Sequence, residues 1–437
     1  MLLSRRAALA ALFVLSSASL LQAQLKPTVV PAATPIAPAV PVVVRPSAER
    51  WAQITPVTAN ARVTRFPVGR GHAGPAVLRV QTLLDRALFS PGMIDGRWGQ
   101  NTEVALYWLQ VREGLPATGA VDSATMSRLE ALAGNPDTVV HRRELRPEDV
   151  RGPFTKIPDD IYQQAKLTCS CYESLTERLT EIFHSGAGLL RQLNPGIKLD
   201  SLVAGDSISV PLVRPMDAPA PGTVAELWVS GSGRFVHAMS AEGRILYHFP
   251  TTLGGTFDPS PQGDFSVASI HENPWWHYQP RILAHVPDDR PDARIPPGPN
   301  NAVGRVWMSL SAPHYGIHGT KSPETIGYAT SAGCVRLTNW DVLFLSRRVP
   351  LGTPVRFRDT RPGQAQPDGG PAVTPRDSTA LKPAPRDSTI RRDSVPPKPA
   401  PRDTSARPSS IPPRPAPRDT SARRDSVPPQ PASSPPR

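Results

Sequence analysis

The chain is short of cysteine, of aromatic residues and of long apolar stretches. It has 437 residues, of which 3 are cysteine and 6% are aromatic. Three thiols cannot build a disulfide framework, because at most one pair forms and one thiol is left over. Residues 7–21 are apolar but fall short of the ~20 residues that span a bilayer. The sequence therefore excludes a multi-span membrane protein, and an uncleaved N-terminal anchor is the alternative left open.

Acidic residues are also in deficit, with 37 against 49 basic ones, giving a formal net charge of +12. Residues 360–437 carry 14 of the basic and 7 of the acidic residues, together with 20 of the 54 prolines and no aromatic side chain. Such a segment buries too little apolar surface to fold. We therefore predict a disordered Pro/Arg/Asp/Ser-rich tail over residues 359–437, acting as a spacer or as a basic wall-binding segment. The remaining chain is only mildly basic, which argues against nucleic acid as a partner.

The first 23 residues have the composition of a signal peptide. Arg5 and Arg6 precede the apolar residues 7–21, and Ala23 stands at the expected cleavage position. The arginine pair also allows the twin-arginine route. Residues 24–73 are rich in Pro, Ala and Val, as in an extended linker. We expect an exported chain, in the periplasm or cell wall, whose folded part follows a tether.

Residues 74–134 are predicted to form a small all-α domain of three helices. Apolar residues recur at helical spacing around Val80, Leu106 and Leu129. The turns between them read Asp-Gly-x-x-Gly-x-x-Thr and Leu-Pro-x-Thr-Gly-x-Val-Asp. This order resembles the three-helix peptidoglycan-binding domain. The alternative is that Asp95 and the glycines serve the turns alone.

Residues 165–213 are predicted to form a small α+β unit. Two amphipathic helices are centred near Leu179 and Leu190, and Asn-Pro-Gly follows the second before an alternating strand. The unit resembles a lysin motif, which implies binding of N-acetylglucosamine chains, although its expected first turn is absent. Cys169 and Cys171 flank one serine there, and an oxidising compartment permits a strained bridge between them.

From residue 224 to residue 358 the pattern becomes the alternation of a mainly β domain. Near its end stand His318 and Cys334, sixteen residues apart. A thiol is a good nucleophile once a neighbouring imidazole accepts its proton, and the amides around Gly333 could bind an oxyanion. Spacing alone leaves open a catalytic pair, two packed core residues, or a zinc site with His314 as a third ligand.

The residues around this pair carry a strong resemblance. His-Gly-Thr at 318–320, followed by Ser-x-Gly-Cys-Val-Arg-Leu-x-Asn-x-Asp at 331–341, is similar to the signature of the L,D-transpeptidase catalytic domain, as are Ser-Pro-Gln-Gly-Asp-Phe at 260–265 and Gly327. The resemblance implies that Cys334 is the nucleophile, that His318 is the base and that the Gly319 carbonyl orients it. It also implies a substrate pocket and oxyanion shell formed by Ser331, Gly333, Arg336 and Tyr315.

Two positions differ from other family members. Ala332 replaces a histidine that often precedes the Gly-Cys pair, which indicates a subgroup and not an inactive protein. Arg336 replaces an asparagine, and its guanidinium could bind a substrate carboxylate bidentately. A structural ion pair between Arg336 and Asp341 is the alternative.

Together these features predict a cell-wall L,D-transpeptidase without metal or cofactor. Its thioester with the third residue of a peptidoglycan tetrapeptide stem would release D-Ala and pass to an amine of a second stem or of a lipoprotein. Water as acceptor would make it an L,D-carboxypeptidase or hydrolase, and loss of catalysis would leave a wall-binding scaffold. The two smaller domains would concentrate the enzyme on glycan strands without taking part in chemistry.

Overall fold

The computed structural model describes residues 53–256, 258–283, 286–287 and 289–358. All of these lie in the first of the two units into which the chain divides, residues 1–375. The predicted signal peptide and the predicted tail at 359–437 lie outside the described residues. In the described part, no helix is long and apolar enough to cross a membrane.

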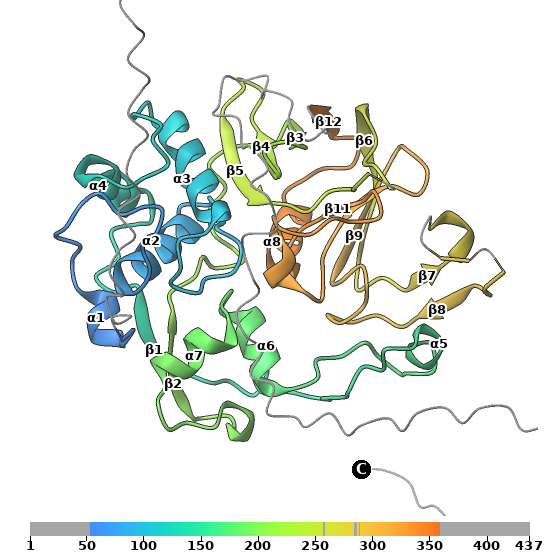
Figure 1. The fold of residues 1–437 in the computed structure, drawn as a ribbon, viewed down its shortest axis with the longest axis horizontal. Coiled ribbons are helices and arrows are strands. Elements are labelled where there is room, and N and C mark those ends of the chain that lie inside the picture. The colour runs from blue at the N-terminus through green and yellow to red at the C-terminus, as the bar shows by residue number, and fades with distance from the viewer. Residues whose placement is uncertain (1–52, 257, 284–285, 288, 359–437) are drawn as a thin grey trace, which may run out of the picture. The chain divides into compact units, whose positions relative to one another are not determined.

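Residues 74–134, here called the helical region, contain three helices that gather around one apolar centre (Figure 1). They are α2 (Pro75–Arg86), α3 (Gln100–Arg112) and α4 (Ser123–Leu132). Helix α2 begins with proline at its first position, where no backbone N–H is needed. Helix α4 begins after Asp122, whose carboxylate accepts a hydrogen bond from the Thr125 amide. The predicted helical domain is confirmed.

A short helix, α1 (Pro56–Asn60), lies inside the segment predicted to be linker. Thr55 and Thr58 form a reciprocal capping box, and Ala59 is fully buried. The Asn60 side chain donates to the Val140 carbonyl at 2.8 Å and accepts from the Val140 amide at 2.9 Å. The linker prediction for residues 24–73 is thus wrong over its described end, because Pro56 starts a helix that packs on its neighbours.

Residues 140–211, here called the middle region, are closed by the antiparallel pair β1 (Val140–Glu144) and β2 (Ser207–Pro211). Between these strands lie α5 (Ile161–Gln164), α6 (Leu175–Ile182), α7 (Ala187–Leu193) and a 3-10 helix, η1 (Leu199–Ser201). The unit therefore begins before residue 165, the predicted boundary. Only Val140 of the first strand is fully buried, so the strand lacks the apolar alternation by which sequence reveals strands.

Cys169 and Cys171 are joined by a disulfide. The loop that they close is fastened to residues 296–300 of the β region. The Ser170 amide donates to the Pro297 carbonyl at 2.9 Å, and the Asn300 side chain donates to the Cys171 carbonyl at 2.9 Å. The middle region therefore contacts the β region through hydrogen-bonded backbone.

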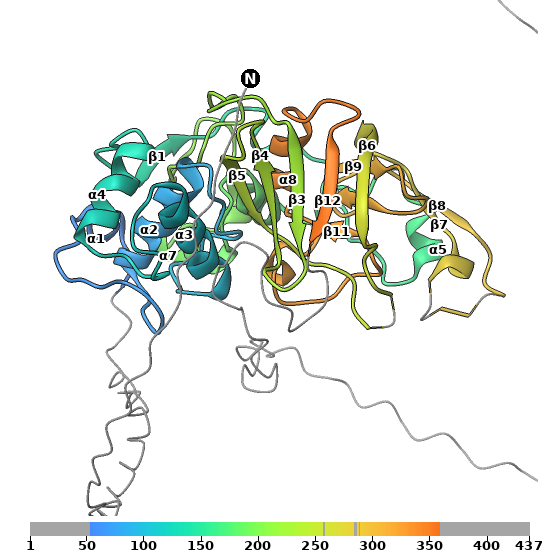
Figure 2. The same ribbon diagram turned by 90° about the horizontal axis from the view of Figure 1, so that it is seen from above.

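Residues 224–358, the β region, form an eight-stranded sheet in the order β11-β10-β9-β6-β12-β3-β4-β5. Figure 2 shows β5, β4, β3, β12 and β6 of this sheet side by side. Its strands are β3 (Glu226–Ser230), β4 (Phe235–Met239), β5 (Ile245–Pro250), β6 (Gly263–Glu272), β9 (Val306–Leu310), β10 (Gly316–His318), β11 (Val335–Arg336) and β12 (Pro354–Arg358). Neighbours are antiparallel except β12 with β3 and β10 with β11. A hairpin of β7 (Trp276–Tyr278) and β8 (Ala293–Ile295) and helix α8 (Asn339–Ser346) complete the region, together with the 3-10 helices η2 (Pro280–Ile282) and η3 (Pro323–Thr325). The predicted mainly β domain is confirmed.

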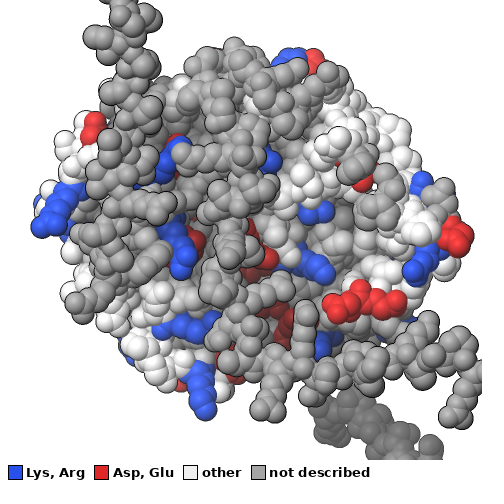
Figure 3. All heavy atoms as spheres, in the orientation of Figure 1, with Lys and Arg blue, Asp and Glu red and all other residues white. Residues whose placement is uncertain are grey.

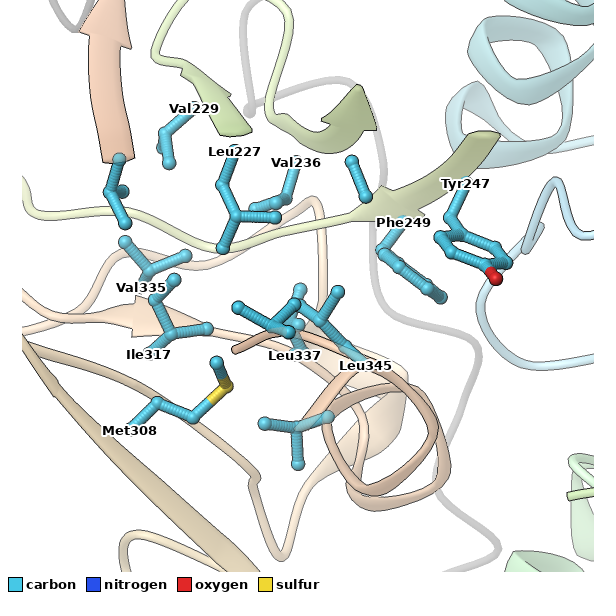
Figure 4. Close-up of a cluster of buried hydrophobic side chains, with 14 of the residues drawn as sticks. Leu227, Val229, Val236, Tyr247, Phe249, Met308, Ile317, Val335, Leu337 and Leu345 are labelled. Atoms are coloured by element: carbon cyan, nitrogen blue, oxygen red, sulfur yellow. The ribbon is translucent and has the colours of Figure 1, made fainter. Parts of the chain in front are cut away.

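The core of the β region lies between the two ends of its sheet and α8. Figure 4 shows Leu227 and Val236 facing Ile317 and Val335, with Leu345 of α8 beside them. All five side chains are almost fully buried. Burial of side chains of this kind contributes roughly 1.5–3 kcal/mol each. The strands that carry His318 and Cys334 are therefore anchored by their neighbouring residues.

The three regions also share packed cores. Phe235, Met239 and Ile245 of the sheet belong to the apolar cluster of the helical region. A second shared cluster joins Ile94 of the helical region to Val140 and Leu189 of the middle region. The described regions are therefore packed together along apolar surfaces.

A buried ionic cluster connects the same three regions. The Arg214 guanidinium donates to the carboxylates of Asp85 in α2 and Asp341 in α8, and all three side chains are at most 2% exposed. Ser90 donates to Asp341 at 2.9 Å, and His184 lies 3.2 Å from Asp85. Burial alone raises the pKa of Asp85, but attraction by Arg214 and His184 outweighs it and lowers that pKa to about 2.

Candidate active site

The register of β10 and β11 brings His318 and Arg336 to one face of the sheet, with Cys334 directly before β11. Ile317 pairs with Val335, and His318 pairs with Arg336. Successive strand residues point to opposite faces. Since Ile317 and Val335 point into the core, His318 and Arg336 point away from it. Cys334 lies in the bend before β11, where the Arg336 charge acts on its thiol.

His318 is held in one tautomer. Its Nδ1 lies 2.7 Å from the Gly319 carbonyl oxygen, which can only accept, so Nδ1 carries the proton and Nε2 has a free lone pair. The Trp307 ring stacks on the imidazole with centroids 5.5 Å apart. Burial, together with the nearby Arg336 charge, lowers the pKa of His318 to about 3 against the opposing effect of the Gly319 bond. The ring is thus neutral, with its Nδ1–H directed at the Gly319 carbonyl.

Cys334 carries a free thiol. Its Sγ donates to the His314 carbonyl oxygen at 3.6 Å, so His314 meets the thiol through its backbone and not its ring. Burial raises the pKa of Cys334, while the Gly316 amide and the Arg336 charge act in the opposite direction. The thiol and the imidazole therefore both favour their neutral forms in the resting protein.

The turn before Cys334 needs its glycine. Gly333 has a φ of 92°, and a Cβ there would lie 2.9 Å from Cε1 of Tyr315. The Ser331 hydroxyl donates to the Cys334 carbonyl at 2.6 Å. Of the predicted site residues, Ser331 thus holds the Cys334 backbone, and the Tyr315 ring lies against Gly333.

Residues 251–254 form a second border of β11. Thr252 and Arg336 exchange backbone hydrogen bonds of 3.1 and 2.9 Å, and the Thr251 hydroxyl donates to the Arg336 carbonyl at 2.7 Å. The Gly254 amide donates to the Ser260 hydroxyl at 2.9 Å, which ties the segment at 260–265 to the site. Sequence reasoning missed Thr251 and Thr252, since neither has a motif of its own.

Arg336 makes no ion pair with Asp341. Asp341 is occupied by Arg214 and Ser90, and no carboxylate in the described part of the chain pairs with the Arg336 guanidinium. The alternative of a structural pair is therefore wrong. Arg336 lies half-buried near Cys334, where its charge can meet an anionic group.

The loop between the two motifs is held by the helical region. The Asn101 side chain donates to the Ile326 carbonyl at 2.9 Å. Gly327 has a φ of 84°, and a Cβ there would lie 2.1 Å from the Asn101 amide oxygen. Its own amide donates to Thr252 at 3.1 Å. Gly327 is thus needed where two regions meet.

Asn339 and Glu181 were not among the predicted site residues. The Asn339 amide oxygen accepts from the Arg305 backbone at 2.9 Å, and its nitrogen donates to Glu181 at 2.9 Å. Asn339 lies inside the recognised signature, so the sequence could have identified it as a site residue. Glu181 lies in the middle region, 137 residues before His318, and no sequence pattern marks it.

The described residues contain no group of three or more His, Cys, Asp and Glu side chains placed to hold a metal ion. Where the fold brings the predicted residues together, the arrangement is that of a thiol, an oriented imidazole and a cation. Such a set can transfer an acyl group through a thioester.

Comparisons with known proteins agree with this chemistry. Residues 226–357 match the L,D-transpeptidase catalytic domain family, and residues 73–129 match a peptidoglycan binding domain family. The L,D-transpeptidase YkuD of Bacillus licheniformis is 32% identical over 41% of this chain and 90% of its own length. An L,D-transpeptidase of Fuscovulum blasticum is 37% identical over 28% of this chain and 64% of its own.

Among solved structures, the L,D-transpeptidase of Xylanimonas cellulosilytica aligns with 68% of this chain and 100% of its own at 16% identity, with a TM-score of 0.30. The match to the Bacillus licheniformis protein covers nearly all of that relative. The chain therefore belongs to the L,D-transpeptidase family of cysteine transpeptidases and carries a peptidoglycan-binding domain before its catalytic domain.

Proposed function

We propose that Cys334 attacks the carbonyl of the third residue of a peptidoglycan tetrapeptide stem, releases the terminal D-Ala, and transfers the stem to an amine. The observation that carries the proposal is the hydrogen bond from Nδ1 of His318 to the Gly319 carbonyl, on a strand that pairs with Val335 and Arg336, directly after Cys334. It leaves Nε2 as the acceptor for the thiol proton.

In the first half-reaction, Nε2 of His318 takes the proton from Sγ as the sulfur attacks. The negative charge that develops on the carbonyl oxygen faces the backbone amides around Gly333 and Cys334. When the tetrahedral intermediate collapses, the C–N bond to D-Ala breaks and the leaving amine takes the proton from the imidazolium. The thioester remains on Cys334.

In the second half-reaction an acceptor amine enters. Neutral His318 removes a proton from that amine as its nitrogen attacks the thioester, and the proton is then returned to the departing sulfur. The amine of a second stem gives a 3-3 cross-link, and a lipoprotein lysine gives an attached lipoprotein. We assign Arg336 to a carboxylate of the donor stem, because its guanidinium lies beside Cys334 without an internal carboxylate partner in the described residues.

The family acts on the cell wall, and its location is extracytoplasmic. We propose that residues 1–23 direct export, that the middle region binds glycan as lysin motifs do, and that residues 359–437 form a spacer. In support, charged atoms of both signs are interspersed with neutral ones on the described part of the face in Figure 3, as suits a neutral polymer such as a glycan chain better than a polyanion.

The test is mass spectrometry of muropeptides after incubation of the purified protein with tetrapeptide-containing material. Cross-linked dimers linked through third residues support the proposal, and tripeptides alone would assign water as the acceptor. An unchanged mixture would leave the protein a wall-binding scaffold. The Cys334→Ser variant is the control, because a hydroxyl in the same place lacks the nucleophilicity of the thiolate.

A further inference from the structure

A carboxylate of the middle region reaches the backbone that supports the catalytic base. Glu181, on α6, accepts a hydrogen bond of 2.9 Å from the Asn339 side chain at the first residue of α8. Its other oxygen accepts from the Tyr172 hydroxyl at 2.8 Å. The Arg305 guanidinium lies 3.9 Å away. The carboxylate is therefore held between two regions of the chain by donors from both.

The Asn339 side chain connects Glu181 to the Gly319 backbone. The side chain is 1% exposed, and its amide oxygen accepts from the Arg305 amide at 2.9 Å. A Cβ built on either Gly304 or Gly319 would lie 2.1 Å from that oxygen. The asparagine is thus wedged against two glycine backbones, so that the position of its amide group sets the position of the Gly319 peptide.

The Gly319 peptide in turn decides the state of His318. The Gly319 carbonyl oxygen accepts a hydrogen bond from Nδ1 of His318, with 2.7 Å between the two atoms. A carbonyl displaced from this direction would release the ring to exchange tautomers or to rotate, and Nε2 would no longer face the thiol as an acceptor. Displacements of about 1 Å in such a geometry can lower rates about 100-fold.

We propose that Glu181 is a positioning residue for the transpeptidase reaction, acting through Asn339 on the Gly319 carbonyl and so on the orientation of His318. The inference rests on the proposed roles of His318 and Cys334. It makes the middle region a part of the catalytic geometry in addition to any glycan binding. A contact needed only to dock α6 on α8 could be apolar. A buried carboxylate between two donors instead fixes the orientation of the groups that it binds, because its lost solvation is replaced only when both hydrogen bonds form.

The first test compares Glu181→Ala and Glu181→Gln in the full chain. We expect the alanine variant to lower kcat for a tetrapeptide stem about 10- to 100-fold with KM within about twofold, since substrate contacts remain. The glutamine variant should keep most of the activity, because its amide oxygen can still accept from Asn339 while its nitrogen donates to the Tyr172 oxygen. Glu173→Ala is the matched control, since that carboxylate accepts from Ile157 inside its own region at 2.7 Å.

The second test does not depend on the substrate. The rate of Cys334 alkylation by iodoacetamide, followed against pH, reports whether His318 assists the thiol. Glu181→Ala should shift this profile toward that of His318→Gln, with melting temperatures recorded for every variant. If His318→Gln changes the profile but Glu181→Ala leaves both the profile and kcat at wild-type values, the positioning role is wrong and the proposed function stands. If His318→Gln changes neither the alkylation profile nor kcat, the assignment of the base is wrong.

A double-mutant cycle separates action through Asn339 from general destabilisation. If Glu181 acts through Asn339, the variant Glu181→Ala/Asn339→Ala should be no slower than Asn339→Ala alone. Losses in kcat that simply multiply would overturn the proposed connection. If alanine at position 181 prevents folding, the glutamine variant tests the connection through Asn339 instead. A folded Glu181→Gln protein without activity would contradict that connection, because its amide oxygen can still accept from Asn339.

Discussion

At the scale of single residues, the resting site holds its proton on sulfur. The pKa of Cys334 is raised by burial, and that of His318 is lowered by burial to about 3. A thiolate–imidazolium pair would need the reverse order of these two values. In the proposed mechanism the nucleophile therefore forms only when a carbonyl is in place to receive it, and we expect this to protect the thiol from unwanted oxidation and alkylation.

This order gives a pH prediction. Neutral His318 persists well below the ordinary imidazole range, and the thiolate appears only above the ordinary thiol value of ~8.5. We expect the alkylation rate of Cys334 in the free enzyme to stay low between pH 5 and 8 and to rise steadily toward pH 10. A plateau of high reactivity between pH 5 and 7 would instead indicate a preformed ion pair.

A substitution at Gly333 tests whether the backbone conformation before Cys334 is needed. Its φ of 92° and the 2.9 Å that would separate a Cβ at this position from the Tyr315 ring leave no room for a side chain. Gly333→Ala should lower the free energy of unfolding by about 1–2 kcal/mol and turnover at least about tenfold, because the backbone at Cys334 must move. Gly188→Ala, in helix α7 with open space around it, is the control and should stabilise slightly. Denaturant titration and turnover assays check both.

At the scale of elements, burial explains which parts of the fold the sequence predicts. Helix α2 has a strongly apolar face and strand β3 alternates between half-buried and buried residues, and both occur where expected. Strand β1 and helix α1 were missed because each buries little of itself and depends on contacts with distant chain. His318, Cys334 and Gly319 were predicted from a compact signature, whereas Glu181 depends on a packing of α6 against α8 that no local pattern contains.

Strands β4 and β5 give an element-scale prediction about stability. His237 and His248 are buried there, 3.0 Å apart through Nε2 and Nδ1, and His248 stacks on Phe89 of the helical region. Burial lowers the pKa of both, that of His248 to about 3. Below pH ~6.5 the unfolded chain binds protons at these two histidines, whereas the folded chain does not. The free energy of unfolding is therefore highest above that pH and decreases as the pH falls toward 3.

The expected loss is about 1.4 kcal/mol per pH unit for each histidine below pH ~6. In His248→Gln the side-chain amide can still form a hydrogen bond with His237 but cannot titrate, so the slope of unfolding free energy against pH should become shallower by about one proton. Chemical denaturation at pH 7, 6 and 5 measures that slope. Equal slopes for both proteins would show that His248 is charged in the folded state.

At the scale of the whole molecule, the structure contradicts a picture of separate modules on a tether. Apolar clusters and the Asp85–Arg214–Asp341 cluster cross between the helical, middle and β regions. The sequence alone predicts that deleting residues 74–132 spares turnover of small muropeptides. The shared cores and the bond from Asn101 to the catalytic loop lead us to expect the opposite, namely that the shortened chain aggregates or loses turnover.

The buried cluster provides the corresponding measurement. Asp85→Ala leaves Arg214 with one carboxylate fewer in a fully buried place and should lower the free energy of unfolding by about 3–5 kcal/mol. Unfolding of residues 53–358 should occur in one transition by fluorescence and circular dichroism alike. Glu272→Ala, which removes an exposed pair with Arg347, should cost at most about 1 kcal/mol. Two resolved transitions would show that the regions unfold as separate modules.

Asp341 ends the signature by which the family is recognised, yet its partners Arg214 and Ser90 stand outside the matched residues 226–357. A gene segment cut at those limits and spliced into another protein would carry a buried anion without its cation. Recombination between relatives is therefore constrained: the portable piece must include Ser90 and Arg214, and exchange of a catalytic segment alone succeeds only if the recipient already supplies a guanidinium at the same place.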